Sequence, residues 1–150
     1  MTDMSPGGFQ KACDLLSHKV DAENFERFRW TRDEFPKLLK LAELIKGSVG
    51  ERTDVEINEE GGEKNTKRFV IKVHGKRIAG IGAALDRGRA VINIGPVERS
   101  PMTVAQGDPI HTDFAKVDEA WIGETLGRLI ERIQPGPNAG GSAPPPKPQA

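Results

Sequence analysis

The sequence has a single cysteine and no tyrosine, and only 5% of its residues are aromatic. One cysteine, Cys13, excludes an intramolecular disulfide, so oxidation contributes nothing to the fold. No apolar run approaches the roughly 18 residues of a membrane-spanning helix. Residues 1–8 also lack the basic and apolar segments of a secretory signal. These absences predict a cytoplasmic protein that has no membrane partner.

The sequence motifs of common catalytic and cofactor sites are missing as well. There is no Cys-x-x-Cys, no His-Glu-x-x-His and no Walker-type glycine-rich loop, and no Gly-x-Ser-x-Gly stands beside a plausible triad. The pair Gly80 and Gly82 lacks the third glycine and the following helix of a dinucleotide fingerprint. We therefore expect no cofactor and no metal, and a non-enzymatic protein is favoured.

The chain of 150 residues, 36% of them hydrophobic, is long enough for one core without metal or disulfide support. Residues 1–8 contain Pro6 and two glycines, and we expect them to be disordered. The tail 135–150 is rich in proline and glycine and has almost nothing to bury, so it is also expected to be disordered. The sequence thus predicts a single α+β domain over residues 9–134.

Two helices are predicted near the ends of this domain. Residues 9–20 have apolar residues at helical spacing, and Cys13 lies on that stripe, which is typical of a small buried hydrophobic residue. The other helix is expected to begin near Asp118 and to end at Pro135. Its core-facing residues repeat at intervals of four, three and four: Ile122, Leu126, Leu129 and Ile133.

The clearest predicted helix covers residues 31–46. Thr31 and Glu34 have the spacing of a capping box, in which each side chain satisfies a free backbone N–H at the helix start. Gly47 marks the expected end of the helix. The apolar stripe of this helix is wide, which indicates substantial burial.

The middle of the chain predicts an antiparallel meander. Period-2 alternation and short turns indicate four strands, within residues 54–58, 68–74, 77–85 and 90–94. Asp86-Arg87-Gly88 is a hairpin signal, and a short turn is expected around His74-Gly75. The favoured architecture is a two-layer α+β sandwich, in which a sheet of four to five strands is covered by two or three helices. The first helix is expected at an edge or in an oligomer interface.

Gly80 and Gly82 share one face of the third predicted strand, because they are two residues apart. No side chain fills that face at these positions, so another group must approach closely. A covering helix is the favoured occupant, and a neighbouring backbone or a ligand is the alternative.

The overall charge is balanced, with 22 basic and 22 acidic residues, but residues 63–99 carry nine basic residues against three acidic ones. Such a surface can bind anions or nucleic acid. The alternative is a solvated sheet edge that lysine and arginine protect against strand pairing. This alternative is favoured because the only aromatic residue of the region, Phe69, is expected on the core side of its strand and so does not interleave the cations. The candidate binding residues are Arg68, Lys72, His74, Arg77, Arg87 and Arg89.

Prolines and glycines interrupt residues 95–116, where Met102–Ala105 and Ile110–Phe114 are each expected to form a short strand. Asp108, His111 and Asp113 cluster there, and this combination suits a metal or an acid–base pair. The plainer interpretation is that Asp108 starts a turn and Asp113 caps one.

Three functions therefore stay open. The favoured one is a binding or adaptor domain that recognises an acidic protein or an anionic ligand, with a homodimer as a second expectation. The alternatives are nucleic-acid binding through the basic sheet face, and a small hydrolase or isomerase that uses residues 108–113.

Overall fold

A computed structural model describes residues 6–63 and 65–136, and the chain divides into two compact units between Pro36 and Lys37. The predicted disorder of residues 1–5 and 137–150 lies outside the described residues, whereas that of residues 135–136 is wrong: Pro135 ends a short strand, and the Gly136 N–H donates to the Pro101 carbonyl oxygen at 3.1 Å. Among the helices of the described part, none combines the length and apolarity that crossing a membrane requires.

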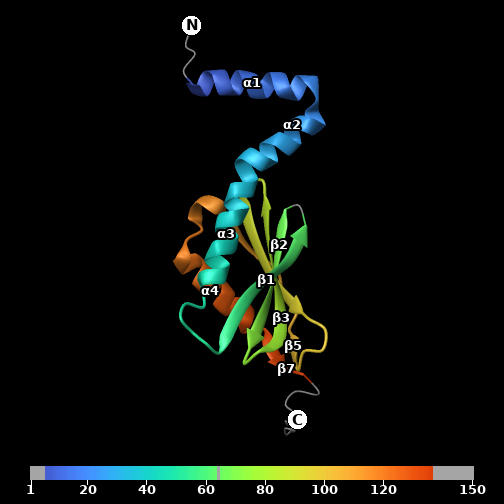
Figure 1. Cartoon of the computed structure of the whole chain (residues 1–150), viewed down its shortest axis with the longest axis vertical. Helices are drawn as coiled ribbons and strands as arrows, with labels where there is room; N and C mark the ends of the chain where they lie inside the picture. Colours follow the sequence, from blue (N-terminus) through green and yellow to red (C-terminus); the bar gives the residue numbers. More distant parts are fainter. Residues whose placement is uncertain (1–5, 64, 137–150) are drawn as a thin grey trace. The chain divides into compact units, whose positions relative to one another are not determined.

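The first unit is helical (Figure 1). It contains α1 (Pro6–Val20), α2 (Ala22–Arg29) and the short π-helix η1 (Trp30–Glu34). Helix α1 begins at Pro6, so residues 6–8 are helical and their predicted disorder is wrong. The prediction of a buried Cys13 is also wrong, because this side chain is exposed.

The capping box predicted at Thr31 does not form. An N-cap residue needs an extended backbone, but residues 30–34 continue the helical path from α2 into α3 (Phe35–Gly47). The Thr31 hydroxyl donates to the carbonyl oxygen of Arg27 at 3.0 Å, one turn earlier. The actual cap is Asp21, which has an extended backbone and accepts a hydrogen bond from the Asn24 N–H at 3.1 Å.

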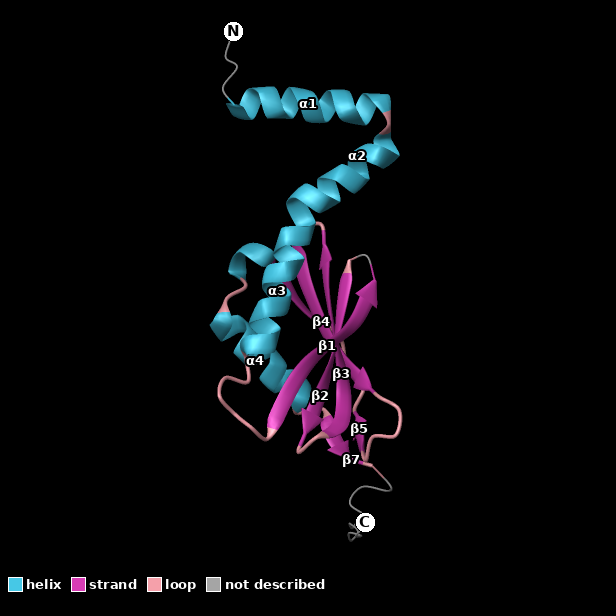
Figure 2. Ribbon diagram, in the orientation of Figure 1, coloured by secondary structure: helices cyan, strands magenta, loops and turns pink. Residues whose placement is uncertain are grey.

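The second unit is an antiparallel sheet with α3 and α4 (Glu119–Ile130) on one side (Figure 2). Its five strands lie in the order β1-β2-β3-β4-β6. This arrangement confirms the predicted α+β class and the antiparallel meander. The strands are β1 (Val55–Glu63), β2 (Thr66–Val73), β3 (Lys76–Asp86), β4 (Arg89–Pro96) and β6 (Ile110–Asp113).

Two further short strands, β5 (Met102–Val104) and β7 (Ile133–Pro135), form a separate two-stranded sheet. Asp118 caps α4 as predicted, by accepting from the Trp121 N–H at 2.8 Å. The helix ends at Ile130, however, because Ile133 pairs with Val104 instead of continuing the helical stripe.

The core lies between the two helices and the sheet. Each helix buries residues at i, i+3, i+4 and i+7, which is the spacing of one helical face. On α3 these are Leu38, Leu41, Ala42 and Ile45; on α4 they are Ile122, Thr125, Leu126 and Leu129. The sheet face that packs against these helices is also buried. Its buried residues include Phe69, Ile71, Ala79, Ile81, Ala83, Leu85, Ala90 and Ile92.

Two tight turns fix the register of the meander. His74 and Gly75 have φ values of 50° and 79°, and Arg87 and Gly88 have values of 50° and 83°. Positive φ at both central residues defines a type I′ turn, which matches the twist of paired strands. Both predicted turns are therefore confirmed.

Glu59 connects α3 to the sheet, because its carboxylate accepts from Lys67 at 2.9 Å and from Lys46 of α3 at 3.1 Å. These two bonds lower the pKa of Glu59 below its usual value. A lowered pKa in the folded state contributes stability above the unfolded-state pKa of about 4.3, and that stability is lost as the pH falls through the folded-state value.

The wild type should lose stability when the pH falls from neutral to below about 4. We expect Glu59→Gln to lose less stability over this range, because it has no carboxylate to protonate at this position. Thermal unfolding of both proteins at the two pH values measures this difference. Lys67→Met is expected to act in the same way, because it removes the largest cause of the shift. If both variants lost as much stability in acid as the wild type, the ion pairs of Glu59 would not be a source of the pH dependence.

Candidate functional site

Three glycines lie close together on the sheet face turned away from the helices. Gly80 on β3 pairs with Gly95 on β4, and the next pair on the same face, two residues along each strand, is Gly82 with Asn93. A cavity of about 330 Å³ lies over these glycines. This volume is at the lower end of the range for small-molecule sites.

Side chains rather than a helix approach the two β3 glycines. A Cβ atom on Gly80 would lie 3.4 Å from Cγ1 of Val97, and one on Gly82 would lie 2.8 Å from Oδ1 of Asn93. The prediction that a helix covers these glycines is wrong, since both helices pack on the opposite face. All three glycines line the cavity, but only Gly95 has open space where a Cβ atom would lie, because Val97 and Asn93 occupy that space at Gly80 and Gly82.

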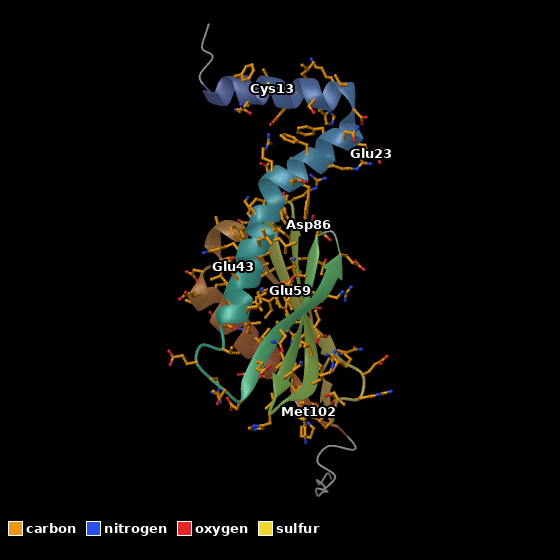
Figure 3. The ribbon with its side chains drawn as sticks, viewed as in Figure 1. Cys13, Glu23, Glu43, Glu59, Asp86 and Met102 are labelled. Atoms are coloured by element: carbon orange, nitrogen blue, oxygen red, sulfur yellow. The ribbon has the colours of Figure 1, made fainter. Side chains whose placement is uncertain are left out.

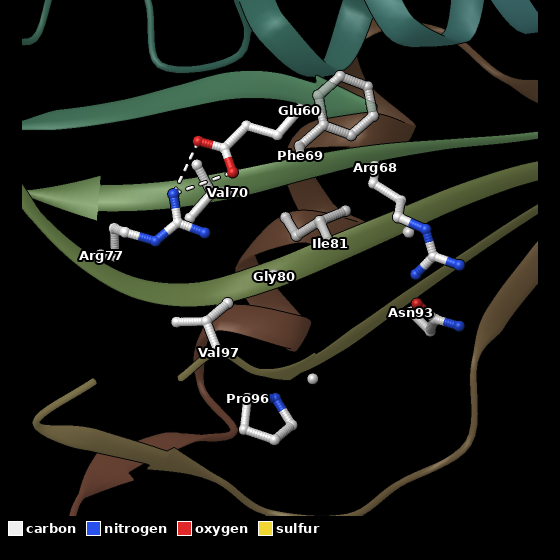
Figure 4. Close-up of a pocket in the computed structure, with 12 residues that line it drawn as sticks. Glu60, Arg68, Phe69, Val70, Arg77, Gly80, Ile81, Asn93, Pro96 and Val97 are labelled. Atoms are coloured by element: carbon white, nitrogen blue, oxygen red, sulfur yellow. Dashed lines mark hydrogen bonds and ion pairs between the residues drawn. The ribbon is translucent and has the colours of Figure 1, made fainter. Parts of the chain in front are cut away.

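An ion pair closes one end of the cavity (Figure 4). Nη1 of Arg77 lies 2.9 Å and 2.7 Å from the two carboxylate oxygens of Glu60. This hydrogen bond, together with the charges of Arg77 and nearby Lys72, lowers the pKa of Glu60 below its usual value. Glu60 is therefore a carboxylate at neutral pH, and Arg77 keeps its remaining N–H groups for other acceptors.

Arg68 and Asn93 lie at the other end of the cavity (Figure 4). The Arg68 side chain is 58% exposed, and its ion pair with Glu63 is long, at 3.6 Å. A pair at this distance in solvent contributes little, so the guanidinium group is available to a ligand. Asn93 adds an amide, and Val70 and Val97 add apolar walls.

A β-bulge in β1 places Glu60. The pairing of β1 with β2 shifts register between Glu59 and Gly62, and Gly61 and Gly62 have φ values of 88° and 152°. A bulge redirects the side chains next to it. The predicted first strand ends at residue 58 and so leaves out Glu60, although the consecutive glycines after an alternating segment are a bulge signal. Asn93 was missed because nothing in the sequence distinguishes it from other polar strand residues.

The six predicted binding residues do not form one surface. Arg68 and Arg77 line the cavity, and Lys72 is the cross-strand partner of Arg77. His74 lies in the β2–β3 turn, where its backbone N–H donates to the Asp54 carbonyl oxygen at 2.8 Å. Arg87 lies in the β3–β4 turn. The meander is less basic than its sequence suggests, because Arg77, Arg68 and Arg89 pair with Glu60, Glu63 and Asp113.

Two residues of the predicted loop site, His111 and Asp113, share Arg89 as a partner, whereas Asp108 contacts a different arginine. His111 contacts the guanidinium group of Arg89, which also pairs with Asp113 at 3.1 Å. The backbone carbonyl of Asp108 accepts from Arg132 at 2.9 Å. Within residues 6–63 and 65–136, no group of three or more histidine, cysteine or acidic side chains is arranged to hold a metal ion.

Known proteins add no further constraint on this site. Comparisons with protein-family models, with curated proteins and with solved structures each find no match to this chain.

Proposed function

We propose that this protein is a binding domain that takes a small anionic ligand, carrying a carboxylate or phosphate group, on the open face of its sheet. The observation that carries the proposal is a cavity with an arginine at each end, Arg68 and Arg77, in which the backbone at Gly95 is open. Glycine lets a ligand lie against the backbone, and a guanidinium group matches the planar geometry of a carboxylate or the oxygens of a phosphate.

The two ends of the cavity have different chemistry, which favours an oriented ligand. Arg68 and Asn93 offer donors to an anionic group. At the other end Glu60 is an acceptor and the free N–H groups of Arg77 are donors, so a polar group of the ligand can bond to both. An acidic peptide segment and a small organic acid share this chemistry.

The alternative functions receive less support from the geometry. Nucleic acid is bound mainly through many unpaired cations that track the phosphates, whereas Arg77 and Arg89 are paired with carboxylates at 2.7 Å and 3.1 Å. Hydrolase or isomerase chemistry needs an acid–base pair within hydrogen-bond reach, and His111 instead faces Arg89.

Binding is tested by titrating the labelled protein with inorganic phosphate, with citrate and with a short acidic peptide. The backbone amide signals of Gly80, Gly82 and Gly95 are expected to shift on titration. Arg68→Gln is expected to weaken binding roughly tenfold or more, because a hydrogen bond to a charged group contributes about 1.5–3 kcal/mol.

Arg128→Gln is the matched control, since Arg128 is 64% exposed on α4 and pairs with Glu124 away from the cavity. It is expected to bind like the wild type. The proposal fails if none of the three probes shifts the glycine signals, or if Arg128→Gln weakens binding as much as Arg68→Gln does.

A further inference from the structure

Helix α1 exposes its apolar side chains. Phe9 is 55% exposed, Leu16 62% and Val20 76%, and Cys13 between them is exposed as well. These four residues repeat at intervals of four, three and four, which is the spacing of the d and a positions in a coiled coil. We call them the α1 stripe; Figure 3 labels Cys13 midway along the helix.

The opposite side of α1 contacts the rest of the first unit. Asp14 accepts two hydrogen bonds from Arg32, at 2.8 Å and 3.2 Å. The ring of His18 lies edge-on to Phe25, with 5.6 Å between the ring centroids. Each residue turns the helix by roughly 100°, so Asp14 and His18 point away from the α1 stripe. The hairpin of α1 and α2 thus turns a polar face inward and an apolar face outward.

We propose that two copies of this chain associate through α1, with one α1 stripe packed against the other. The stripe is complementary to itself. An antiparallel pairing sets Phe9 against Val20 and Cys13 against Leu16, so that a larger side chain meets a smaller one in every layer.

The residues that flank the α1 stripe would not repel a second copy of the helix. At the e and g positions of this register only Lys19 is charged; the others are Gln10, Ala12 and Ser17. In the antiparallel pairing Lys19 faces Ala12 of the other copy, so no like charges meet. A two-fold symmetric pair is also the commonest assembly of identical chains. The proposal is independent of the cavity on the sheet.

The molar mass of the full-length chain tests this inference. In sedimentation equilibrium between about 1 µM and 1 mM, the wild type is expected to pass from monomer to dimer. Leu16→Glu places a charge inside the paired stripes and is expected to weaken the dimer roughly tenfold or more. Leu15→Glu is the matched control. Leu15 is 64% exposed on the same helix but outside the stripe, and this variant is expected to dimerise like the wild type.

Cys13 provides a second measurement, because a chain with one cysteine can be cross-linked through thiols only to another chain. A short bismaleimide is expected to link wild-type copies, but not Leu16→Glu at the same concentration. The double variant Cys13→Ser/Glu51→Cys moves the thiol to an exposed turn and is expected not to cross-link. A wild type that is monomeric throughout, a dimer that Leu16→Glu leaves intact, or a dimer that Cys13 fails to cross-link would each overturn the proposal.

Discussion

Replacing Ile92 with alanine is expected to lower the free energy of unfolding by about 2–5 kcal/mol. Ile92 has no exposed surface, and its neighbours in the sheet register are Ala83 on β3 and Ile110 on β6. The loss combines the transfer of the deleted carbons with the cavity that they leave, which a close-packed interior fills only in part. Denaturant-induced unfolding of the variant and the wild type measures the difference.

Val91 gives this experiment a control from the adjacent position. It points to the open face of the sheet and is only half-buried, so Val91→Ala is expected to cost clearly less. Ile92→Val, which leaves a smaller cavity, is expected to cost about 0.5–1.5 kcal/mol. If Ile92→Ala were no more costly than Val91→Ala, the core would not lie on the side of the sheet that the helices cover.

Replacing Gly62 with alanine is expected to cost about 1–3 kcal/mol, because strain would be added to a backbone that already has a positive φ. A Cβ atom at this position would lie 2.3 Å from the carbonyl oxygen of Thr66. Such a contact with backbone cannot be relieved by rotating a side chain, so the bulge itself must move. We expect a lower unfolding midpoint together with shifted amide signals around Glu60 and Arg77.

The adjacent glycine separates the two contributions. A Cβ atom on Gly61 would meet nothing within 4 Å, although φ is 88° there. Gly61→Ala therefore adds conformational strain without a collision and is expected to cost less than Gly62→Ala. Equal costs would mean that the contact with Thr66 is not what requires glycine at position 62.

Most of the second unit follows from local patterns in the sequence. Alternation gave the strands of the meander, the positive-φ turns were visible as His74-Gly75 and Arg87-Gly88, and Asp118 marked the start of α4. Each of these signals is contained within a few consecutive residues. The order of strands β1 to β4 then follows from short connections.

The candidate site could not be predicted in the same way, because it depends on pairing across strands. Arg68 and Arg77 were identified as cations. Their position relative to Glu60, however, depends on the bulge that shifts the register between β1 and β2. Which face the helices cover is also a tertiary property, so Gly80 and Gly82 were assigned the wrong neighbour. Periodicity similarly identified the apolar face of α1 without showing that it stays exposed.

The position of β1 at one edge of the sheet has a consequence for solubility. An edge strand offers unpaired backbone groups that can recruit a strand from another molecule and so begin aggregation. β1 carries Glu56, Glu59, Glu60 and Glu63 and is interrupted by the bulge. Charge and irregularity are two of the features by which natural edges resist such recruitment. At the β1 edge of the sheet, four glutamates and the bulge therefore disfavour pairing with a strand of another molecule.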